Sequence, residues 1–314
     1  MKIVVYIPQA DFTIEQQNKL AGLGEVVYTK NSDELSMGQL IEIAKGADIV
    51  AADPDPLGGF EKAKPIFTKI MESLPDLKGV CLSTTSFGRI ELDYCKSRNL
   101  PISNVPGYSR ESVAEHAIAL LLCLAKRIIV SDRQTQAGKY KMVMGFELKG
   151  KTLGIIGLGN IGSRVAELGM AMGMKVIAYN RSPKQMAGLE MKTLDEVLTQ
   201  SDAISINTTH EDANVGILGK EQISKLKKDV IIVNTVDREI FDEQALADAL
   251  KSGQVYGYAL EAEDLNSGPL AGVENAILIK GFGWYTKEAL QNLYQIIVDN
   301  VVALAKGNPV NRIV

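Results

Sequence analysis

The stretch Lys151-Thr-Leu-Gly-Ile-Ile-Gly-Leu-Gly-Asn-Ile-Gly-Ser163 decides the fold of this chain. Its apolar run, Leu153 to Ile156, is typical of a strand, and glycines follow in the spacing Gly-x-Gly-x-x-Gly. A helical stretch, Ser163 to Met172, and a second apolar run, Val176 to Tyr179, complete a strand–turn–helix–strand unit. Such a unit places a pyrophosphate at the amino end of its helix. The sequence therefore predicts a dinucleotide site here, the alternative being an ordinary packing turn.

The three glycines have different expected roles. Gly157 allows the tight turn, Gly159 lets backbone amides approach the phosphates, and Gly162 permits close packing of the helix against the strand. The residues expected to contact the dinucleotide in this turn are Gly157, Leu158, Gly159, Asn160, Ile161 and Gly162.

Composition bounds the class of protein. A chain of 314 residues is long enough for two domains of ordinary size, and 46% hydrophobic with 23% charged residues is typical of a soluble globular protein. A net charge of −4 is small for this length and argues against a nucleic-acid-binding surface. We expect a small-molecule substrate and no nucleic-acid partner.

The three cysteines and the apolar runs indicate the compartment. The cysteines are odd in number and lack metal-ligand spacing, so we predict no metal and a reducing environment. The longest apolar run, residues 117–125, is too short to span a bilayer, and the chain opens on a strand pattern rather than a leader. The prediction is a cytoplasmic protein without membrane attachment.

Strands alternate with helices along the whole chain, which predicts parallel sheets covered on both faces. The expected strands are residues 2–7, 26–28, 48–51, 79–82, 203–207, 230–234, 256–260 and 276–279. The expected helices are residues 13–23, 35–45, 60–74, 194–199, 220–226, 242–252 and 287–306.

The middle of the chain contains a nearly all-apolar helix, predicted over Ala114 to Ile129. Such a helix must be buried on most sides, against the second domain or a partner subunit. Ser112 and Glu115 match a capping box, although the helix could begin a turn earlier. Residues 138–150 are predicted to be a loop.

Over nearly its whole length the sequence resembles the D-isomer-specific 2-hydroxyacid dehydrogenase family. The stretches that carry the resemblance are Asn104-Val-Pro-Gly-Tyr108, Ser112-Val-Ala-Glu115, Leu148 to Gly162, Leu226 to Lys228, Asn234-Thr235 and Phe241 to Leu250. The resemblance implies an α/β protein with a Rossmann dinucleotide-binding domain, residues 104–285. It also implies a smaller flavodoxin-like substrate domain, residues 1–103 and 286–314, again with a parallel sheet. A homodimer through residues 112–150 and a substrate cleft between the domains are further implied.

The resemblance fails at the residues that carry the family's chemistry. The family uses a histidine as acid/base, a supporting glutamate, and an arginine that holds the substrate carboxylate. Here Asp237 stands at the arginine position with Arg238 one residue late, and Ile279-Lys280-Gly281 replaces Thr-Pro-His. The glutamate position before a proline is Gly268. General acid–base catalysis contributes about 10²–10⁴-fold, so we expect ordinary 2-oxo acid reduction to be severely impaired.

The chain has two histidines. His116 lies within the apolar helix and is predicted to be a structural core residue. His210 follows a predicted strand and is expected to be a loop residue near the cofactor.

Several residues could replace the missing catalytic set. The candidates for catalysis are Asp237, Arg238, Lys280, Tyr285 and Glu263, with surface or packing roles as the alternative for the last three. The candidates for substrate contact are Thr84, Thr85, Ser86 and Trp284. Acidic side chains at 237 and 261 would suit a cationic or amine-bearing substrate such as an imine.

The residues after the second strand of the dinucleotide unit predict the coenzyme. NAD-preferring sites have an acid there that binds the ribose. This chain has Asn180, Arg181 and Ser182, and Arg181 can hold a 2′-phosphate, which favours NADP. The alternative is NAD with Arg181 stacked on the adenine. The remaining cofactor candidates are Asn207, Thr208, Thr209, Thr235, Val236 and Glu261, the last at a cofactor-facing aspartate position of the family.

Two hypotheses follow. The first is an NADP- or NAD-dependent oxidoreductase with an altered active site and a small, non-standard substrate. The second is a non-catalytic NAD(P)-binding sensor or partner-recruiting protein on the same scaffold.

Overall fold

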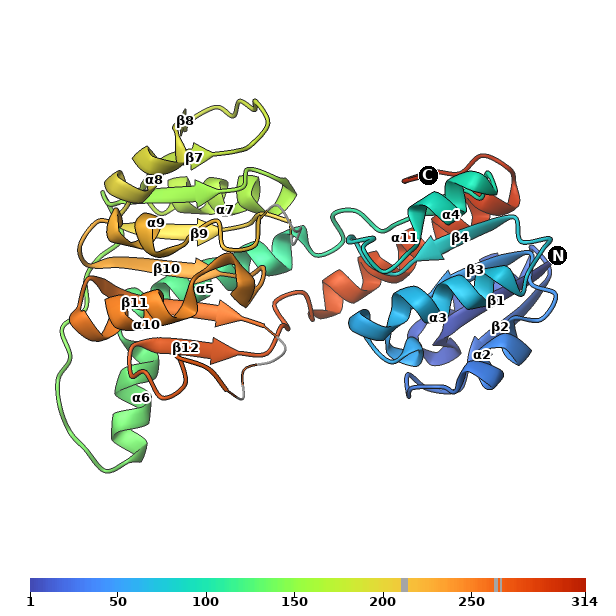
Figure 1. Ribbon diagram of the computed structural model, residues 1–314, viewed down its shortest axis with the longest axis horizontal. Helices are drawn as coiled ribbons and strands as arrows, with labels where there is room; N and C mark the ends of the chain where they lie inside the picture. Colours follow the sequence, from blue (N-terminus) through green and yellow to red (C-terminus); the bar gives the residue numbers. More distant parts are fainter. Residues whose placement is uncertain (210–213, 263–264, 266) are drawn as a thin grey trace. The chain divides into compact units, whose positions relative to one another are not determined.

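The computed structural model divides the chain into two compact units, each built on one parallel sheet (Figure 1). The terminal unit comprises Met1–Tyr108 and Lys287–Val314, and the central unit comprises Ser109–Thr286. The structure describes residues 1–209, 214–262, 265 and 267–314.

The terminal unit has the strand order β2-β1-β3-β4-β5, which is the flavodoxin-like order. Its strands are β1 (Lys2–Pro8), β2 (Glu25–Thr29), β3 (Ile49–Ala52), β4 (Gly79–Leu82) and β5 (Ile102–Ser103). Its α-helices are α1 (Ile14–Ala21), α2 (Met37–Ala44), α3 (Phe60–Glu72), α4 (Leu92–Ser97) and α11 (Lys287–Ala305), and η1 (Gln9–Asp11) and η2 (Asp55–Leu57) are short 3₁₀ turns.

Burial on both faces explains the continuous apolar strands of this unit. Residues 3–7 of β1 are all buried, as expected for an interior strand of a parallel sheet. Helices α1 and α2 begin at capping boxes, where Thr13 and Ser36 each accept the amide of a glutamine three residues on. The returning helix α11 packs on β3, β4 and α1.

The central unit has the strand order β12-β11-β10-β9-β6-β7-β8. Its strands are β6 (Thr152–Ile156), β7 (Lys175–Tyr179), β8 (Glu190–Met191), β9 (Ala203–Ile206), β10 (Val230–Asn234), β11 (Val255–Glu261) and β12 (Ala276–Ile279). Its helices are α5 (Arg110–Ala125), α6 (Ile128–Gln136), α7 (Asn160–Ala171), α8 (Leu194–Gln200), α9 (Lys220–Ser224) and α10 (Glu243–Ser252), with a 3₁₀ turn η4 (Arg238–Ile240). Counted from β6, this is the doubly wound order of Rossmann domains extended by one strand, and the order reverses between β6 and β9. The predicted fold class is confirmed.

The single helix predicted over residues 114–129 is wrong. Helix α5 begins at Arg110 and ends at Ala125, and Arg127 adopts a left-handed conformation (φ 58°) before α6 starts. The capping box is also wrong, because Ser109 is the N-cap and Ser112 lies inside α5. The earlier start was the alternative left open. Helix α5 is buried within its own unit, where it packs on β10, β11 and α7.

The segment after α6 contains no helix or strand over residues 138–149, as predicted. Figure 1 shows α6 and this segment extending beyond the sheet of the central unit. The sequence did not predict the two-residue strands β5 and β8 or the short helix α4. Across the described part of the chain, every helix is too short or too polar to cross a membrane.

Candidate functional site

The turn between β6 and α7 is shaped by its glycines. Gly157 has φ 92°, and a Cβ there would lie 2.7 Å from the carbonyl oxygen of Asn207. A Cβ on Gly162 would lie 2.0 Å from the carbonyl oxygen of Gly157, so the helix approaches the turn too closely for any side chain. Gly159 is the N-cap of α7, and no side chain forms a capping hydrogen bond there. A Cβ on Gly159 would stand in open space. The first amides of α7 are therefore available to an anion.

The segment after β7 is tied to this turn. The side-chain oxygen of Asn180 accepts the Leu158 amide at 2.9 Å, and its Nδ2 donates to the Ser182 carbonyl at 2.8 Å. Lys184 Nζ donates to the Leu158 carbonyl. Arg181 and Ser182 are exposed. These contacts place two cationic residues, Arg181 and Lys184, beside the glycine turn.

The segment after β9 lies next to the turn because β6 and β9 are neighbours in the sheet. Asn207 Nδ2 donates to the Ser205 carbonyl and hydroxyl, both at 3.1 Å. The Thr208 hydroxyl is buried without a hydrogen-bond partner among the described residues. The Thr209 carbonyl accepts the Asn214 side chain at 2.7 Å. An uncapped helix end, an open glycine and an orphaned hydroxyl at the switch point fit a bound dinucleotide. His210 lies outside the described residues.

The turn after β10 is held by Asn234, which is fully buried. Its Nδ2 donates to the Asp237 carbonyl at 2.7 Å and to the Tyr258 hydroxyl at 3.0 Å, and its Oδ1 accepts the Val236 amide at 3.0 Å. Burial raises the pKa of Tyr258, so its hydroxyl remains neutral. These bonds fix the backbone of Thr235 and Val236 between the strand end and Asp237.

Asp237 and Arg238 have different surroundings. Asp237 caps η4, where its Oδ1 accepts the Glu239 amide at 2.9 Å. The Arg238 guanidinium forms a bidentate pair with Glu243 on α10, with Nε–Oε1 at 3.0 Å and Nη2–Oε2 at 2.7 Å. It also donates to the Ser267 carbonyl at 3.1 Å. Arg238 is thus bound to a carboxylate of its own unit.

The carboxylate of Glu261 ends β11 in a buried position, 7% exposed. Its Oε1 accepts the amides of Phe282, at 2.6 Å, and Gly283, and lies 3.6 Å from His116 Nε2. Ser112 donates its hydroxyl to the Gly283 carbonyl. His116 packs edge-on against Phe282, with 5.4 Å between ring centroids. Sequence reasoning missed this meeting of α5, β11 and the segment after β12, and no local pattern signals it.

The segment after β12 carries exposed side chains. Lys280, a candidate for catalysis, is exposed. Trp284 Nε1 donates to the Gly281 carbonyl at 3.0 Å, and the rings of Trp284 and Tyr285 meet at 5.3 Å. These rings are 37% and 64% exposed. Glu263, another catalytic candidate, lies outside the described residues.

The candidate substrate loop of the terminal unit, after β4, is held by hydrogen bonds within that unit. Thr84 donates its hydroxyl to the Ser86 carbonyl at 2.7 Å, and Thr85 donates to the Val105 carbonyl at 2.8 Å. The loop ends at Arg89, which is 4% exposed. Burial lowers the pKa of Arg89 to about 10, while Asp53 opposes the shift. Sequence reasoning did not single out Arg89, a buried cation beside the candidate loop.

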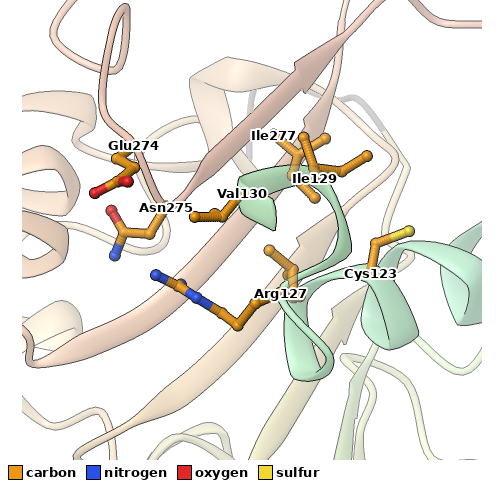
Figure 2. Close-up of a pocket in the computed structure, with 8 residues that line it drawn as sticks. Cys123, Arg127, Ile129, Val130, Glu274, Asn275 and Ile277 are labelled. Atoms are coloured by element: carbon orange, nitrogen blue, oxygen red, sulfur yellow. The ribbon is translucent and has the colours of Figure 1, made fainter. Parts of the chain in front are cut away.

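A small pocket at the other edge of the central sheet is a separate feature (Figure 2). Figure 2 shows the Arg127 side chain extending toward Asn275, and the guanidinium also lies 4.7 Å above the Tyr256 ring. Residues 274–275 precede β12, so this pocket lies at the amino edge of the parallel sheet. Open α/β sheets bind ligands at the carboxyl edge, which places the candidate site elsewhere. The described residues contain no group of three or more side chains suited to hold a metal.

Known proteins resemble this chain over its full length. D-3-phosphoglycerate dehydrogenase of Archaeoglobus fulgidus is 31% identical over 100% of this chain, which spans 59% of that relative's length. Hydroxypyruvate reductase of Blautia hydrogenotrophica is 31% identical over 93% of this chain and 92% of its own. The solved structure of an acyclic imino acid reductase, Bsp5, in complex with NADPH and D-Arg is 28% identical, covers 100% of both chains and has a TM-score of 0.85.

The family description "D-isomer specific 2-hydroxyacid dehydrogenase, NAD binding domain" matches residues 118–280. The match covers the glycine turn and the strand ends on which the candidate site is built. Together with the relatives named as dehydrogenases and reductases, it identifies the protein as an NAD(P)-dependent oxidoreductase. The chain belongs to the D-isomer-specific 2-hydroxyacid dehydrogenase family.

Proposed function

We propose that this protein is an NADPH-dependent reductase of a small amine-bearing substrate, reduced at a carbon–nitrogen double bond. The observation that carries the proposal is Asp237, an acid at the position where the family motif has the carboxylate-binding arginine. Gly281 at the histidine position agrees with it. Further support comes from the imino acid reductase bound to NADPH and D-Arg, which this chain matches along its whole length.

Charge at Asp237 favours a cationic substrate. A carboxylate attracts a cation at 4 Å by about 1 kcal/mol in bulk water and about 4 kcal/mol near a protein surface, and it repels an anion by as much. Arg238 does not reverse this preference, because its guanidinium is paired with Glu243. We therefore assign Arg238 a structural role and Asp237 the role of attracting a protonated imine.

A protonated imine also explains why the family histidine is dispensable. The chemistry that the coenzyme supplies when bound is hydride donation. The imine carbon gains the hydride, the π electrons become the nitrogen lone pair, and the resulting amine takes its next proton from water. A carbonyl oxygen needs an acid at this step, whereas the imine nitrogen already carries its proton. Lys280 and Tyr285 remain the candidates for proton exchange, and Trp284, Thr84, Thr85 and Ser86 the candidates for substrate contact.

The residues that would hold the coenzyme lie around the glycine turn. Asn180 offers an amide where NAD-preferring sites have a carboxylate, so a 2′-phosphate meets no repulsion there. Arg181 and Lys184 supply positive charge beside it. We therefore favour NADP over NAD. The other proposed coenzyme contacts are Gly157 to Gly162, Ser182, Asn207, Thr208, Thr209, Thr235 and Val236.

The test compares a substrate that lacks a carbon–nitrogen double bond with substrates that have one. NADPH oxidation is followed with a 2-oxo acid alone, with the same acid plus ammonium or methylamine, and with a preformed cyclic imine. We expect turnover only with nitrogen present. Asp237→Asn, which can still cap η4, should lower kcat/KM for the imine by about tenfold, which corresponds to about 1.4 kcal/mol. Asp248→Asn, at an exposed aspartate of α10, is the matched control.

Two outcomes would overturn the proposal. If the 2-oxo acid is turned over equally fast with and without amine, the protein catalyses the ordinary family reaction. Tight NADPH binding without turnover of any compound would favour the non-catalytic sensor.

We also propose a homodimer through residues 112–150. Tyr140, Met142 and Met144 are 95%, 86% and 86% exposed, an unusual concentration of apolar surface for a monomer. A sedimentation mass equal to one chain of 34.1 kDa would contradict this assembly.

A further inference from the structure

The peptide of Phe282 and Gly283 has every backbone polar group bonded. Glu261 Oε1 accepts both amides, at 2.6 Å for Phe282. Ser112 donates to the Gly283 carbonyl, and the Phe282 carbonyl accepts the Tyr285 amide at 2.8 Å. The loop before Trp284 is therefore fixed by side chains from two other elements, α5 and β11.

The space around Gly283 is filled by two of these side chains. A Cβ on Gly283 would lie 2.9 Å from Glu261 Oε2 and 3.0 Å from His116 Cδ2. Ser112 and Glu261 are 9% and 7% exposed, so their polar groups need partners inside the protein. Two amides meet this need for Glu261 Oε1, while His116 Nε2 lies 3.6 Å away without a hydrogen-bond partner among the described residues.

The length of Glu261 matters for these bonds. An aspartate would withdraw the carboxylate by about 1.5 Å, one carbon–carbon bond. The Phe282 amide would then lie beyond hydrogen-bond distance, which ends near about 3.2 Å. The hydrogen bonds between Glu261 and these amides therefore depend on the length of the side chain as well as on its charge.

We propose that Glu261, Ser112 and His116 are positioning residues that fix the loop of residues 281–285, so that Trp284 and Tyr285 present their rings to the substrate. Glu261 has this role instead of contacting the coenzyme. The part of this inference that concerns substrate contact by Trp284 and Tyr285 rests on the proposed function. The loop half does not, because it concerns the conformation of the protein alone.

Trp284 is the single tryptophan of the chain, so its fluorescence reports on this loop without substrate or coenzyme. In Glu261→Asp we expect a lower anisotropy and roughly twofold stronger acrylamide quenching, because an unanchored loop opens locally. Glu261→Gln keeps an acceptor oxygen at full length and should stay near wild type. Glu274→Asp, at an exposed glutamate before β12, is the matched control. Circular dichroism verifies that each variant is folded.

Kinetics supply the second measurement. In Glu261→Asp the KM for the imine should rise about tenfold, while the NADPH dissociation constant stays within twofold of wild type. Unchanged Trp284 quenching in Glu261→Asp would overturn the loop assignment. Weaker NADPH binding in Glu261→Gln with unchanged fluorescence would overturn it too, by making Glu261 a coenzyme ligand. A fluorescence change in a protein whose wild type reduces no imine would support the loop assignment and reject the proposed function.

Discussion

The turn after β6 and the loop after β12 both follow a strand end at the same edge of one sheet, but they are built differently. The turn is made of backbone, with glycines at 157, 159 and 162 and the open amino end of α7. The loop is made by side chains, with Glu261, Ser112 and His116 converging on Phe282 and Gly283. A backbone site is contained in one continuous stretch, whereas the side-chain site needs residues from three separate parts of the chain.

Under the proposed function, this difference separates coenzyme binding from substrate choice. The main-chain amides of the turn can serve any dinucleotide-dependent reaction on this scaffold. The loops after β10 and β12 carry Asp237 and Gly281, the two positions on which the proposed change of substrate rests. The fold therefore says little about the substrate, and the side chains at these strand ends say most.

The largest expected effect comes from adding a methyl group to the turn. In Gly162→Ala the new Cβ would lie 2.0 Å from the Gly157 carbonyl oxygen, a backbone atom that cannot move aside. We expect a loss of about 3 kcal/mol in the free energy of unfolding and loss of NADPH binding. Urea unfolding and calorimetry measure the two quantities.

Gly159→Ala is the matched control within the same turn. Its φ of −77° suits any residue, and open space surrounds the new methyl group. The free energy of unfolding should change by less than about 0.5 kcal/mol, while NADPH binding weakens because the methyl group stands over the helix amides. Unchanged NADPH binding in Gly159→Ala would show that the turn is only a packing feature.

An intermediate loss of stability is expected when the ion pair between Arg238 and Glu243 is broken. Arg238→Met leaves Glu243, 16% exposed in its side chain, without its bidentate partner. We expect about 2 kcal/mol less stability, between the values for surface and buried pairs. The kcat of the folded enzyme should stay near wild type. A hundredfold loss of kcat with unchanged stability would instead make Arg238 catalytic.

The smallest effect is expected at Arg181, beside the glycine turn, and it concerns the choice between NADPH and NADH. Arg181→Ala should raise the KM for NADPH about tenfold, or about 1.4 kcal/mol, and leave the KM for NADH unchanged. Steady-state kinetics with both coenzymes provide the measurement. Equal effects on NADPH and NADH would remove the phosphate-binding role of Arg181.

The sequence predicts the backbone-made parts well and the side-chain-made parts poorly. The glycine spacing, its flanking strands and both sheet classes follow from local patterns. The break at Arg127 does not, because the apolar pattern resumes at Ile128 and Ile129 and therefore predicted a single helix. The pairing of Arg238 with Glu243 depends on the path of η4 between them.

Glu261 and Lys280, two of the candidate site residues, also have surroundings that the sequence did not predict. The family resemblance puts Glu261 at a coenzyme-facing position, and the structure shows its carboxylate accepting the amides of Phe282 and Gly283. Lys280 directly follows β12, and its side chain is exposed. Where a side chain points is set by tertiary packing, which a single sequence does not record.

The two-segment make-up of the terminal unit has a consequence for biosynthesis. Helix α11 supplies Leu293, Ile297 and Val301 to the core of that unit, and it lies so close to β4 that a Cβ on Gly79 would be 2.6 Å from Leu304. On the ribosome, residues 1–108 therefore emerge with one sheet face covered only in part, by Phe12 and Leu20, and that face stays incomplete until the whole central unit has been translated. Until α11 leaves the exit tunnel, the nascent chain exposes that apolar face to chaperones and proteases.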